Sequence, residues 1–356
     1  MKKKKIILAG GGTAGHVNPN IALLPELSRA GFEAVYIGSE NGIEKKLVTD
    51  AGIPFYGICS GKLRRYASLK NFTDAFRVVK GVGDAFSVIM KEKPKIIFSK
   101  GGFVCVPVIF AAKLAGVPVV AHESDVTPGL TNKIAYPLAK AVCATFPETM
   151  QYIPKNKGIL TGAPLRKELF SGSKKKGLSF CGFSGKKPVL LIMGGSSGAV
   201  KINKAVRSVL EKMTNTFDVI HLCGKGNTDP LLKTQGYVQF EYISNELGDL
   251  LACCDIVLSR AGSNAIFEFL SLCKPSVLVP LSKKASRGDQ ILNADIFQKS
   301  GYCAVINEEN LTGEVILEKM SEVYANREYY INNMKNAKAC DGVAEIIKVL
   351  QKYSKP

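Results

Sequence analysis

Residues 255–294, DIVLSRAGSNAIFEFLSLCKPSVLVPLSKKASRGDQILNA, decide the fold. The apolar run at residues 256–258 predicts a buried strand, which ends in a tight turn at residues 260–263 with Ser263 as a helix N-cap. A second strand is predicted over residues 276–279, and a basic loop and another helix follow it. Short apolar strands that alternate with helices predict βαβ units and a parallel sheet.

The same stretch carries residues suited to a sugar nucleotide. A helix that starts at Ser263 offers free N–H groups and the positive end of its dipole, which suits a phosphate. Glu268 lies about one and a half turns into that helix and can accept both hydroxyls of a ribose. Asp289 and Gln290 begin the next helix and are placed to bind sugar hydroxyls. The alternative is an ordinary βαβ unit with a surface glutamate.

Both halves of the chain repeat this pattern. A glycine loop at residues 10–16 follows a strand at 5–9, and a second glycine loop at 194–198 follows a strand at 189–193. Further strands are predicted near 34–38, 95–99, 117–122, 141–145, 158–161, 218–223, 238–242 and 304–306. This predicts an α/β protein with two Rossmann-like doubly wound domains. Because such folds bind ligands at the carboxyl ends of their strands, we expect the domains to face a central cleft.

The length of 356 residues also suggests two domains. We expect an N-terminal domain over residues 1–163 and a C-terminal domain over 164–339. The helix at 340–356, with an apolar stripe, is expected to fold back onto the first domain. Residues 163–187 are rich in lysine, glycine and serine and predict a linker.

Composition limits the function. The net charge of +18 indicates a polyanionic partner: nucleic acid, an anionic membrane or a phosphorylated substrate. No tryptophan occurs and no aromatic–basic interleaving marks a base-stacking surface, which argues against nucleic acid. Ten scattered cysteines without a CxxC pair predict a reduced, cytoplasmic protein, and the three histidines lack metal-site spacing.

No signal peptide and no membrane-crossing stretch is evident, so we expect any membrane contact to come from one side. Residues 62–93 carry Phe72, Phe76 and Val79 at helical spacing. Basic side chains flank them, namely Arg64, Arg65, Lys70, Arg77 and Lys80. The segment predicts either a helix that lies on an anionic interface or a stripe of core residues.

The first glycine loop leaves another function open. Gly10, Gly12 and Gly15 form GxGxxG, and Glu40 follows the second strand, as in dinucleotide-binding oxidoreductases. His16 comes directly after this loop, where chemistry or a plain helix start could use it. The second loop lacks GxGxxG and suits a phosphate held by backbone N–H groups and by the hydroxyls of two serines, Ser196 and Ser197. A non-catalytic anion or nucleic-acid binder is a third class.

Several ordered motifs together resemble the MurG family over essentially the whole chain: GGTAGH, SKGGFV, HESDVTPGLTNKIA, GAPLR, MGGSSGA, SRAGSNAIFEFL and SRGDQILNA. The resemblance implies a GT-B fold and transfer of N-acetylglucosamine from UDP-GlcNAc to lipid I, which gives lipid II in peptidoglycan synthesis. It further implies an undecaprenyl-linked acceptor, a peripheral place on the cytoplasmic face of the cell membrane, no cofactor, and contact with other cell-wall enzymes. Another UDP-sugar enzyme on this scaffold, a glycolipid synthase or a UDP-GlcNAc epimerase, is the main rival.

The resemblance also implies the site residues. Those on the donor side are Arg166, Ser196, Ser197, Ile243, Arg260, Ser263, Asn264, Glu268, Asp289 and Gln290. Those on the acceptor side are Gly12, Thr13, Ala14, Gly15, His16, Phe103, His122, Glu123 and Asp125. Three residues depart from the family pattern. Ala14 stands where glycine is frequent, Asp289 where many members have glutamine, and Asp125 where many have asparagine.

The implied reaction is attack of an acceptor C4 hydroxyl on the anomeric carbon, with inversion and loss of UDP. Helix N-termini would stabilise the leaving diphosphate, and the chain has no Asp-x-Asp motif, which fits a mechanism without a metal. His16 is the first choice as general base because an imidazole titrates near neutral pH. Asp125 and Glu123 are the alternatives.

Overall fold

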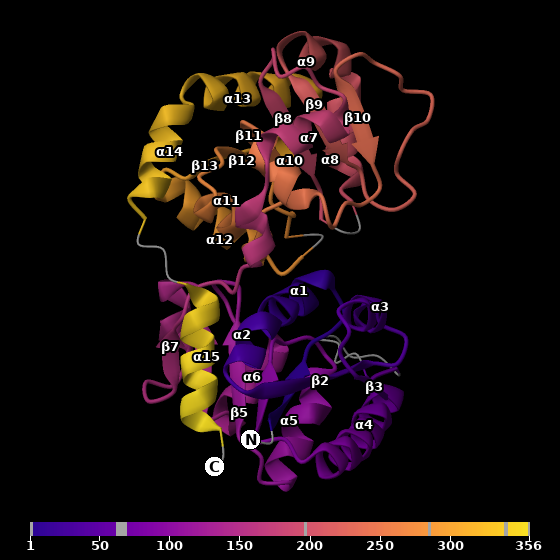
Figure 1. Cartoon of the computed structure of the whole chain (residues 1–356), viewed down its shortest axis with the longest axis vertical. Helices are drawn as coiled ribbons and strands as arrows, with labels where there is room; N and C mark the ends of the chain where they lie inside the picture. The colour runs from indigo at the N-terminus through magenta and orange to yellow at the C-terminus, as the bar shows by residue number, and fades with distance from the viewer. Residues whose placement is uncertain (1–2, 62–69, 196–197, 284–285, 338–340, 355–356) are drawn as a thin grey trace. The chain divides into compact units, whose positions relative to one another are not determined.

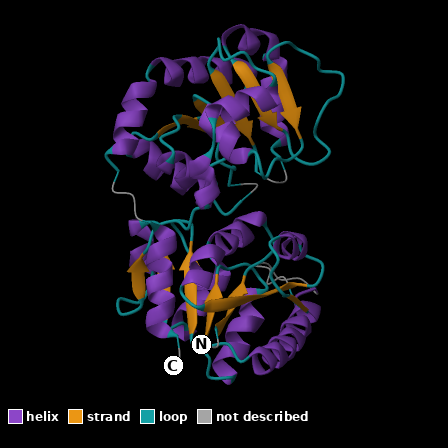
Figure 2. Ribbon diagram, viewed as in Figure 1, coloured by secondary structure: helices purple, strands orange, loops and turns teal. Residues whose placement is uncertain are grey.

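The computed structural model describes residues 3–61, 70–195, 198–283, 286–337 and 341–354. The chain divides into two compact units, Met1–Arg166 with Cys340–Pro356, and Lys167–Ala339. In each unit, helices cover both faces of a parallel sheet (Figures 1 and 2). The predicted α/β class with two doubly wound domains is therefore confirmed.

The first unit contains a sheet in the order β3-β2-β1-β4-β5-β6-β7, with every neighbouring pair parallel. Its strands are β1 Lys4–Ala9, β2 Phe32–Ser39, β3 Phe55–Ile58, β4 Ile96–Ser99, β5 Val119–Glu123, β6 Ala141–Ala144 and β7 Gly158–Leu160. Its helices are α1 Ala14–Ala22, α2 Leu24–Arg29, α3 Ile43–Asp50, α4 Lys70–Glu92, α5 Cys105–Leu114, α6 Leu130–Leu138, α15 Gly342–Tyr353 and the 3-10 helix η1 Pro147–Tyr152. The strand β3 is an addition to those expected from the sequence.

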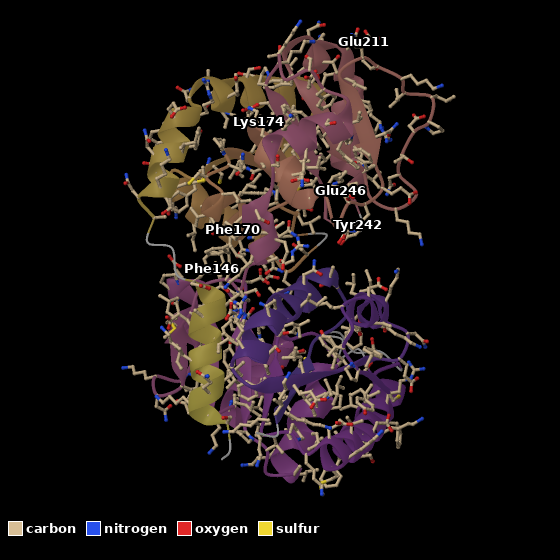
Figure 3. The ribbon with its side chains drawn as sticks, in the orientation of Figure 1. Phe146, Phe170, Lys174, Glu211, Tyr242 and Glu246 are labelled. Atoms are coloured by element: carbon tan, nitrogen blue, oxygen red, sulfur yellow. The ribbon has the colours of Figure 1, made fainter. Side chains whose placement is uncertain are left out.

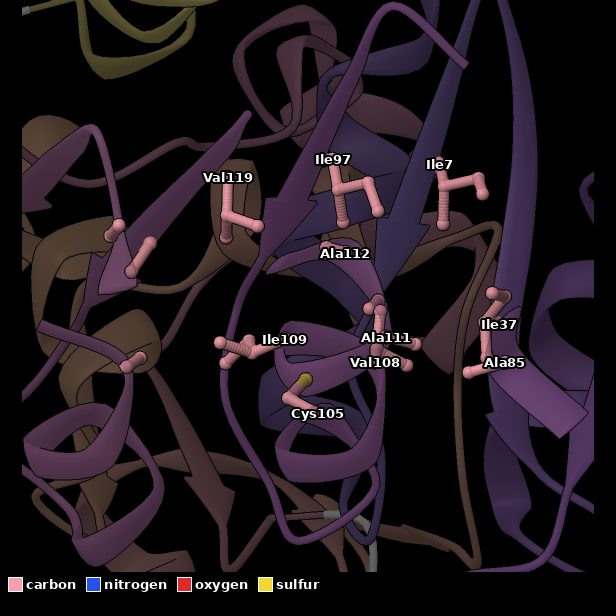
Figure 4. Close-up of a cluster of buried hydrophobic side chains, with 14 of the residues drawn as sticks. Ile7, Ile37, Ala85, Ile97, Cys105, Val108, Ile109, Ala111, Ala112 and Val119 are labelled. Atoms are coloured by element: carbon pink, nitrogen blue, oxygen red, sulfur yellow. The ribbon is translucent and has the colours of Figure 1, made fainter. Parts of the chain in front are cut away.

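Alternation along β1 separates two cores in this unit. Ile7 and Ala9 face one side, where α4, α5 and α6 pack, and Figure 4 shows α5 side chains such as Val108 against that side of the sheet. Ile6 and Leu8 face the other side and meet α1, α2 and α3. Successive side chains of a strand point to opposite faces, so one apolar run serves both cores.

The C-terminal helix α15 belongs to the first unit. Its Ile346 and Leu350 are fully buried in the core formed with Ile6, Leu27 and Phe98. Figure 1 draws this yellow helix against the unit that contains the N-terminus. An apolar stripe at helical spacing thus packs on a sheet that the chain completed earlier in its sequence.

The second unit contains a sheet in the order β10-β9-β8-β11-β12-β13, again parallel throughout. Its strands are β8 Val189–Met193, β9 Asp218–Leu222, β10 Tyr237–Phe240, β11 Ile256–Ser259, β12 Ser276–Leu278 and β13 Cys303–Val305. Its helices are α7 Lys174–Cys181, α8 Val200–Ser208, α9 Leu210–Thr216, α10 Leu247–Cys253, α11 Ser263–Ser271, α12 Asp289–Lys299, α13 Gly313–Ala325 and α14 Arg327–Lys335, with 3-10 helices η2 Lys167–Ser171 and η3 Glu308–Asn310.

The predicted linker at residues 163–187 is wrong for most of its length. It folds into η2 and α7, on which Figure 3 labels Phe170 and Lys174, and these pack on α10 within the second unit. Two glycines permit this contact: a Cβ on Gly172 would lie 2.0 Å from a backbone oxygen of α10, and one on Gly177 would lie 2.3 Å from another. The glycines that suggested flexibility are required for close packing of two helices.

Both sheets reverse their strand order at the first strand of their unit. In the first unit this point lies between β1 and β4, and in the second between β8 and β11. Ligands of doubly wound folds bind where the order reverses. The glycine loop of each unit follows one strand of its reversal pair, so the topology places each loop at such a point.

None of the helices in the described ranges is long and apolar enough to span a bilayer.

Candidate functional site

A cavity of about 400 Å³ opens at the strand reversal of the second unit. It lies at the ends of β8 and β11 and at the starts of α8 and α11. Its lining residues are Met193, Gly194, Gly195, Gly198, Ala199, Val200, Lys201, Ser259, Arg260, Gly262, Ala265, Leu281, Gln290 and Glu308. Its size is that of a small-molecule site, and two helix starts contribute to its wall.

The second glycine loop forms one wall of this cavity. Gly195 and Gly198 adopt left-handed φ values of 82° and 76°, which glycine tolerates and other residues rarely adopt. A Cβ on Gly198 would also lie 2.2 Å from the carbonyl oxygen of Cys223. The backbone can therefore approach a ligand closely here. Ser196 and Ser197, expected to bind phosphate, lie outside the described residues.

A buried ion pair forms the floor. The Arg260 guanidinium donates to Glu308 at 2.7 Å and to the carbonyl oxygen of Val279 at 3.0 Å. Glu308 also accepts from Ser282 N at 3.4 Å and pairs with Lys201 at 3.2 Å. Burial opposes its ionisation, but these three donors outweigh burial and lower the pKa of Glu308 to about 2. One carboxylate therefore fixes two cations beside the cavity.

Neither Glu308 nor Lys201 was predicted as a site residue. Glu308 comes three residues after the end of β13, and its position after a strand was an available signal. Lys201 lies in the first turn of α8, which the glycine loop precedes. What the sequence could not provide is the pairing, because 48 residues separate Arg260 from Glu308.

The predicted sugar residues lie on the two helices next to the cavity. Ser263 is buried and Asn264 half-buried in the first turn of α11, and Glu268 is half-buried five residues after Ser263. Glu268 is not among the lining residues of the cavity, whereas Ala265, three positions earlier on the helix, is. The N-cap of α11 is Gly262, so the prediction of Ser263 as the cap is wrong by one residue.

Gln290 lines the cavity, and its Oε1 accepts from Leu281 N at 3.1 Å. Asp289 begins α12 and pairs with Arg287 at 2.6 Å, so this departure from the family pattern has a local partner. Ile243 is half-buried in the loop after β10, where Figure 3 labels the adjacent Tyr242. Arg166 ends the Met1–Arg166 segment of the first unit and is not among the lining residues.

In the first unit, a side chain of the protein itself binds at the glycine loop. Glu44 of α3 is fully buried, and its carboxylate accepts from Gly12 N at 3.3 Å, from Ser39 N at 2.8 Å and from the Ser39 hydroxyl. A methyl group on Gly42 would lie 2.2 Å from this carboxylate, so glycine makes room for it. The anion in this loop is therefore a side chain of the protein.

This arrangement disfavours the dinucleotide interpretation. A bound pyrophosphate needs the loop N–H groups, and a buried carboxylate at the same loop would repel it. Glu40, the residue expected to bind the ribose of a dinucleotide, is exposed. The GxGxxG spacing is present, but the loop that carries it already contacts a buried carboxylate of the protein.

The acceptor-side loops meet in the first unit. Gly12 lies against the Phe103 ring, since a Cβ there would be 3.1 Å from Phe103 Cε1. A Cβ on Gly101 would lie 3.8 Å from the His16 ring and 3.7 Å from the Asn132 amide. Thr13 is the N-cap of α1, which starts at Ala14, and Gly15 is exposed in its first turn.

His16 is oriented by the backbone of its own loop. Its Nδ1 lies 2.9 Å from the carbonyl oxygen of Gly11 and 3.4 Å from the Thr13 hydroxyl. A carbonyl only accepts, so Nδ1 carries a proton, and in the neutral imidazole Nε2 carries the lone pair. The ring is half-buried. This tautomer is the one required of a general base that acts through Nε2.

Glu123 accepts its hydrogen bonds from the loop that follows it. It is buried and accepts from the backbone N–H groups of Ser124, Asp125 and Gly129 and from the Asn132 amide, at 2.8–3.2 Å. Burial, followed by the charge of Asp125, raises its pKa. A carboxylate with four donors organises the loop after β5, which argues against Glu123 as the general base.

His122, which is predicted on the acceptor side, lies inside the first unit. Its ring is fully buried, and Nδ1 accepts from Lys100 Nζ at 2.7 Å. Burial and the Lys100 charge hold the pKa of His122 well below its usual range. The ring is therefore neutral and structural. Asp125 lies two residues beyond Glu123, where β5 ends, and is half-buried.

Two family descriptions match the chain: the glycosyltransferase family 28 N-terminal domain over residues 6–144 and the C-terminal domain over residues 189–350. A relative from Clostridium perfringens strain SM101 is 56% identical over 353 residues, which cover 99% of both chains. The chain belongs to the MurG family of glycosyltransferase family 28. The resemblance to this family is therefore confirmed.

That family member is named UDP-N-acetylglucosamine--N-acetylmuramyl-(pentapeptide) pyrophosphoryl-undecaprenol N-acetylglucosamine transferase, and a Clostridium tetani protein of the same name is 54% identical over 99% of this chain and 98% of its own. The fold also matches the crystal structure of Acinetobacter baumannii MurG, with a TM-score of 0.74, 24% identity and coverage of 98% and 99%. A UDP-GlcNAc 2-epimerase from Neisseria meningitidis gives a TM-score of 0.71 at 17% identity, covering 98% of this chain and all of its own. The GT-B fold is thereby confirmed.

No group of three or more metal-ligating side chains with suitable geometry occurs among the described residues. The cysteines that the structure describes are all free thiols.

Proposed function

We propose that this MurG family member is an inverting glycosyltransferase. It moves N-acetylglucosamine from UDP-GlcNAc to the C4 hydroxyl of the muramyl sugar in undecaprenyl-linked lipid I and so forms lipid II. The observation that carries the proposal is the cavity at the glycine loop of the second unit, with its two helix starts and its Arg260–Glu308 pair. The names of the relatives supply the substrates.

The donor diphosphate fits the wall made by Gly195, Gly198 and the start of α8. Backbone N–H groups there carry partial positive charge, and Lys201 adds a full charge. Negative charge grows on the diphosphate as the glycosidic bond breaks. Donors that are already in place at that position stabilise the transition state without reorganisation.

The donor sugar and ribose are assigned to α11 and α12. Glu268 binds the ribose hydroxyls, while Asn264, Asp289 and Gln290 bind the N-acetylglucosamine. Gln290 lines the cavity, and Asp289 is held by Arg287. Ile243 contacts the uracil through its backbone. These assignments follow the family motifs, and the positions of the two helix starts support them.

The acceptor is assigned to the first unit, with His16 as general base. The base takes the proton of the attacking hydroxyl at Nε2, because Nδ1 is engaged with Gly11 O. Gly12, Thr13 and Phe103 line the acceptor, and Asp125 is the alternative base. Glu123 acts on the acceptor only through the loop that it holds, and His122 only through Lys100, which its ring contacts.

A membrane-binding helix is the second part of the proposal. Phe76 and Val79 of α4 are 71% and 70% exposed, and the adjacent Arg77 and Lys80 are exposed bases. Residues three apart share one face of a helix, so the exposed apolar pair can enter the interface of an anionic cytoplasmic leaflet. The side chains of Phe72, Arg64, Arg65 and Lys70 lie outside the described residues.

Vesicle sedimentation tests this helix. We expect the double variant Phe76→Asp, Val79→Asp to bind anionic vesicles about tenfold less or weaker still. Two apolar side chains are lost, and two negative charges are added that the anionic vesicle surface repels. The control is Leu231→Asp, which changes an 88% exposed side chain of the second unit. Equal binding by the double variant and by the control would remove α4 from the proposal.

The activity test uses UDP-GlcNAc and a short-chain lipid I analogue, with and without EDTA. We expect the disaccharide lipid and UDP in both conditions, because backbone N–H groups and basic side chains are proposed to stabilise the diphosphate. Loss of turnover with EDTA would contradict the metal-free mechanism alone. Conversion of UDP-GlcNAc to its 2-epimer would favour the epimerase alternative. Absence of both products, with no donor-induced rise in Tm, would contradict the donor site.

A further inference from the structure

Two buried polar side chains bind the backbone of the first glycine loop from inside the first unit. Tyr36 of β2 and Asn20 of α1 are both fully buried. Asn20 Nδ2 donates to the Tyr36 hydroxyl at 3.1 Å, and that hydroxyl donates to the carbonyl oxygen of Gly10 at 3.0 Å. Burial raises the pKa of Tyr36, so the hydroxyl keeps the proton that it donates. Side chains from two elements therefore form a hydrogen-bonded series that ends on the loop.

Glycine at position 10 lets these side chains reach the backbone. A Cβ on Gly10 would lie 3.0 Å from the Tyr36 hydroxyl oxygen and 3.1 Å from Asn20 Nδ2. It would also lie 2.6 Å from the carbonyl oxygen of His16. Glycine, however, leaves its own backbone free to rotate, and residues 10–12 are three glycines in succession. Hydrogen bonds from outside the loop are therefore needed to fix its peptide groups.

The next peptide group of the loop orients His16. Gly11 O, one residue after the carbonyl that Tyr36 binds, accepts from His16 Nδ1 at 2.9 Å. The same peptide group donates through Gly12 N to Glu44 at 3.3 Å. Glu44 thus holds the peptide group that contains Gly11 O, and Tyr36 holds the one before it. The His16 ring depends on this carbonyl for its orientation and for the proton on Nδ1.

We propose that Tyr36 is a positioning residue for the general base and that Asn20 acts through it. The hydroxyl holds the Gly10 peptide, so the carbonyl of Gly11 stays turned toward His16. This keeps the proton on Nδ1 and the lone pair on Nε2, where the base needs it. The inference rests on the proposed function, because it takes His16 as the base of that reaction. The orientation of the ring can nevertheless be measured without substrate.

The tautomer of His16 gives that measurement. The other two histidines of the chain are His122 and His221. His122 Nδ1 accepts from the Lys100 ammonium, so its proton lies on Nε2. His221 Nε2 lies 3.0 Å from Asn203 Oδ1, which accepts, so its proton also lies on Nε2. One Nδ1–H ring should therefore appear in ¹⁵N NMR spectra at about pH 7.5, where an ordinary histidine is mostly neutral.

Tyr36→Phe removes the hydroxyl and keeps the ring. We expect about half or more of the Nδ1–H signal of His16 to be lost to the Nε2–H form, and kcat with the lipid I analogue to fall about tenfold. KM for UDP-GlcNAc should stay within about twofold, because the donor cavity lies in the other unit. An unchanged tautomer in the folded variant would overturn the inference.

The matched control is Tyr56→Phe. It removes another tyrosine hydroxyl of the same unit, which donates to Glu92 at 2.5 Å. We expect the control to keep the His16 tautomer, and to keep kcat within about twofold even where Tm falls. An equal loss of kcat in the control and in Tyr36→Phe would mean that general destabilisation causes both losses, and would overturn the positioning role.

Asn20→Ala tests the first step of the series. The other hydrogen bond of Asn20 goes to Ala9 O at 3.3 Å, and that carbonyl also accepts from Lys100 N at 2.9 Å. Loss of the amide therefore affects the loop mainly through the Tyr36 hydroxyl, which it orients. We expect a smaller fall in kcat than in Tyr36→Phe, and little further loss in the double variant. Single effects that multiply in the double variant would contradict action through Tyr36.

Asn20→Ala also decides the outcome if Tyr36→Phe does not fold. An unchanged Nδ1–H signal of His16 in Asn20→Ala would then overturn the inference. Failure of the wild-type protein to glycosylate the lipid I analogue would contradict the proposed function instead. The tautomer would in that case still decide whether the buried side chains orient His16.

Discussion

The two glycine loops have the same setting in the topology and opposite electrostatics. Each follows the first strand of its sheet and precedes a helix. In the first loop, the Glu44 carboxylate accepts from Gly12 N. In the second, the Glu308 carboxylate holds Arg260 and Lys201, and a cavity of about 400 Å³ remains open. In the first unit the buried glutamate binds the loop itself. In the second unit the buried glutamate binds two cations beside the loop, and the site stays open.

This contrast assigns different tasks to the loops. The open loop offers positive charge to a ligand, as a nucleotide diphosphate requires. The filled loop offers a rigid backbone on which His16 is oriented through Gly11 O. The first loop should therefore act in proton transfer and the second in anion binding.

The largest expected effect is that of His16→Ala. We expect kcat to fall about 100-fold or more, since a positioned general base contributes that much. The donor-induced rise in Tm should persist, because the donor cavity lies entirely in the other unit. Steady-state kinetics with the lipid I analogue measure the first quantity. Nearly full turnover would move the base to Asp125.

Glu44→Ala tests whether the first loop is filled from within. The change leaves Ser39 N and the Ser39 hydroxyl, which are buried, without their acceptor, and each buried unpaired group costs about 1–3 kcal/mol. We expect the free energy of unfolding to fall by about 3 kcal/mol or more, as measured by urea denaturation. The control is Glu40→Ala, an exposed glutamate of the same segment. Equal losses in both variants would contradict the buried role of Glu44.

Glu308→Gln tests the cations of the second loop. Loss of the charge weakens the hold on Arg260 and Lys201 by about 1.5 kcal/mol, so we expect the Kd of UDP-GlcNAc to rise about tenfold. Calorimetric titration measures it, and Glu309→Gln, an exposed neighbour, is the control. An unchanged Kd would mean that the ion pair only supports the fold.

The smallest effect concerns pH. Glu308 has a pKa of about 2 in the folded protein, below its ordinary 4.5, so the unfolded chain binds more protons between these values. Its stabilisation is therefore complete above about pH 4.5 and is lost as pH falls through about 2. We expect the difference in unfolding free energy between wild type and Glu308→Gln to shrink over that range. A difference that stays constant would contradict this linkage.

The sequence predicts the central strands well because they are short apolar runs buried on both faces, as in residues 189–193 and 256–259. It fails where composition conflicts with packing. The lysines and glycines of residues 163–187 indicated a linker, yet Gly172 and Gly177 let α7 approach α10. Secondary-structure propensity is local, so it cannot predict a contact whose partner lies about 70 residues away.

The buried charges are the part of the site that the sequence could not predict. Nothing in the sequence marks Glu44, Lys100 and Glu308 as buried, since charged side chains are mostly exposed. Each is buried in the structure by partners from other elements, such as Ser124 for Lys100 and Arg260 for Glu308. Motif positions could be assigned from the resemblance, whereas the side chains that hold those motifs in place are evident only from the three-dimensional structure.

The helix α15 has a consequence for biosynthesis. It fills the core of the first unit with Ile346 and Leu350, although the whole of Lys167–Ala339 precedes it in the chain. On the ribosome the first sheet must therefore wait, with an apolar face uncovered, until the entire second unit has emerged. Translation pauses within that unit would prolong the exposure, and a chaperone that binds nascent apolar surface would find its target on the half of the protein made first.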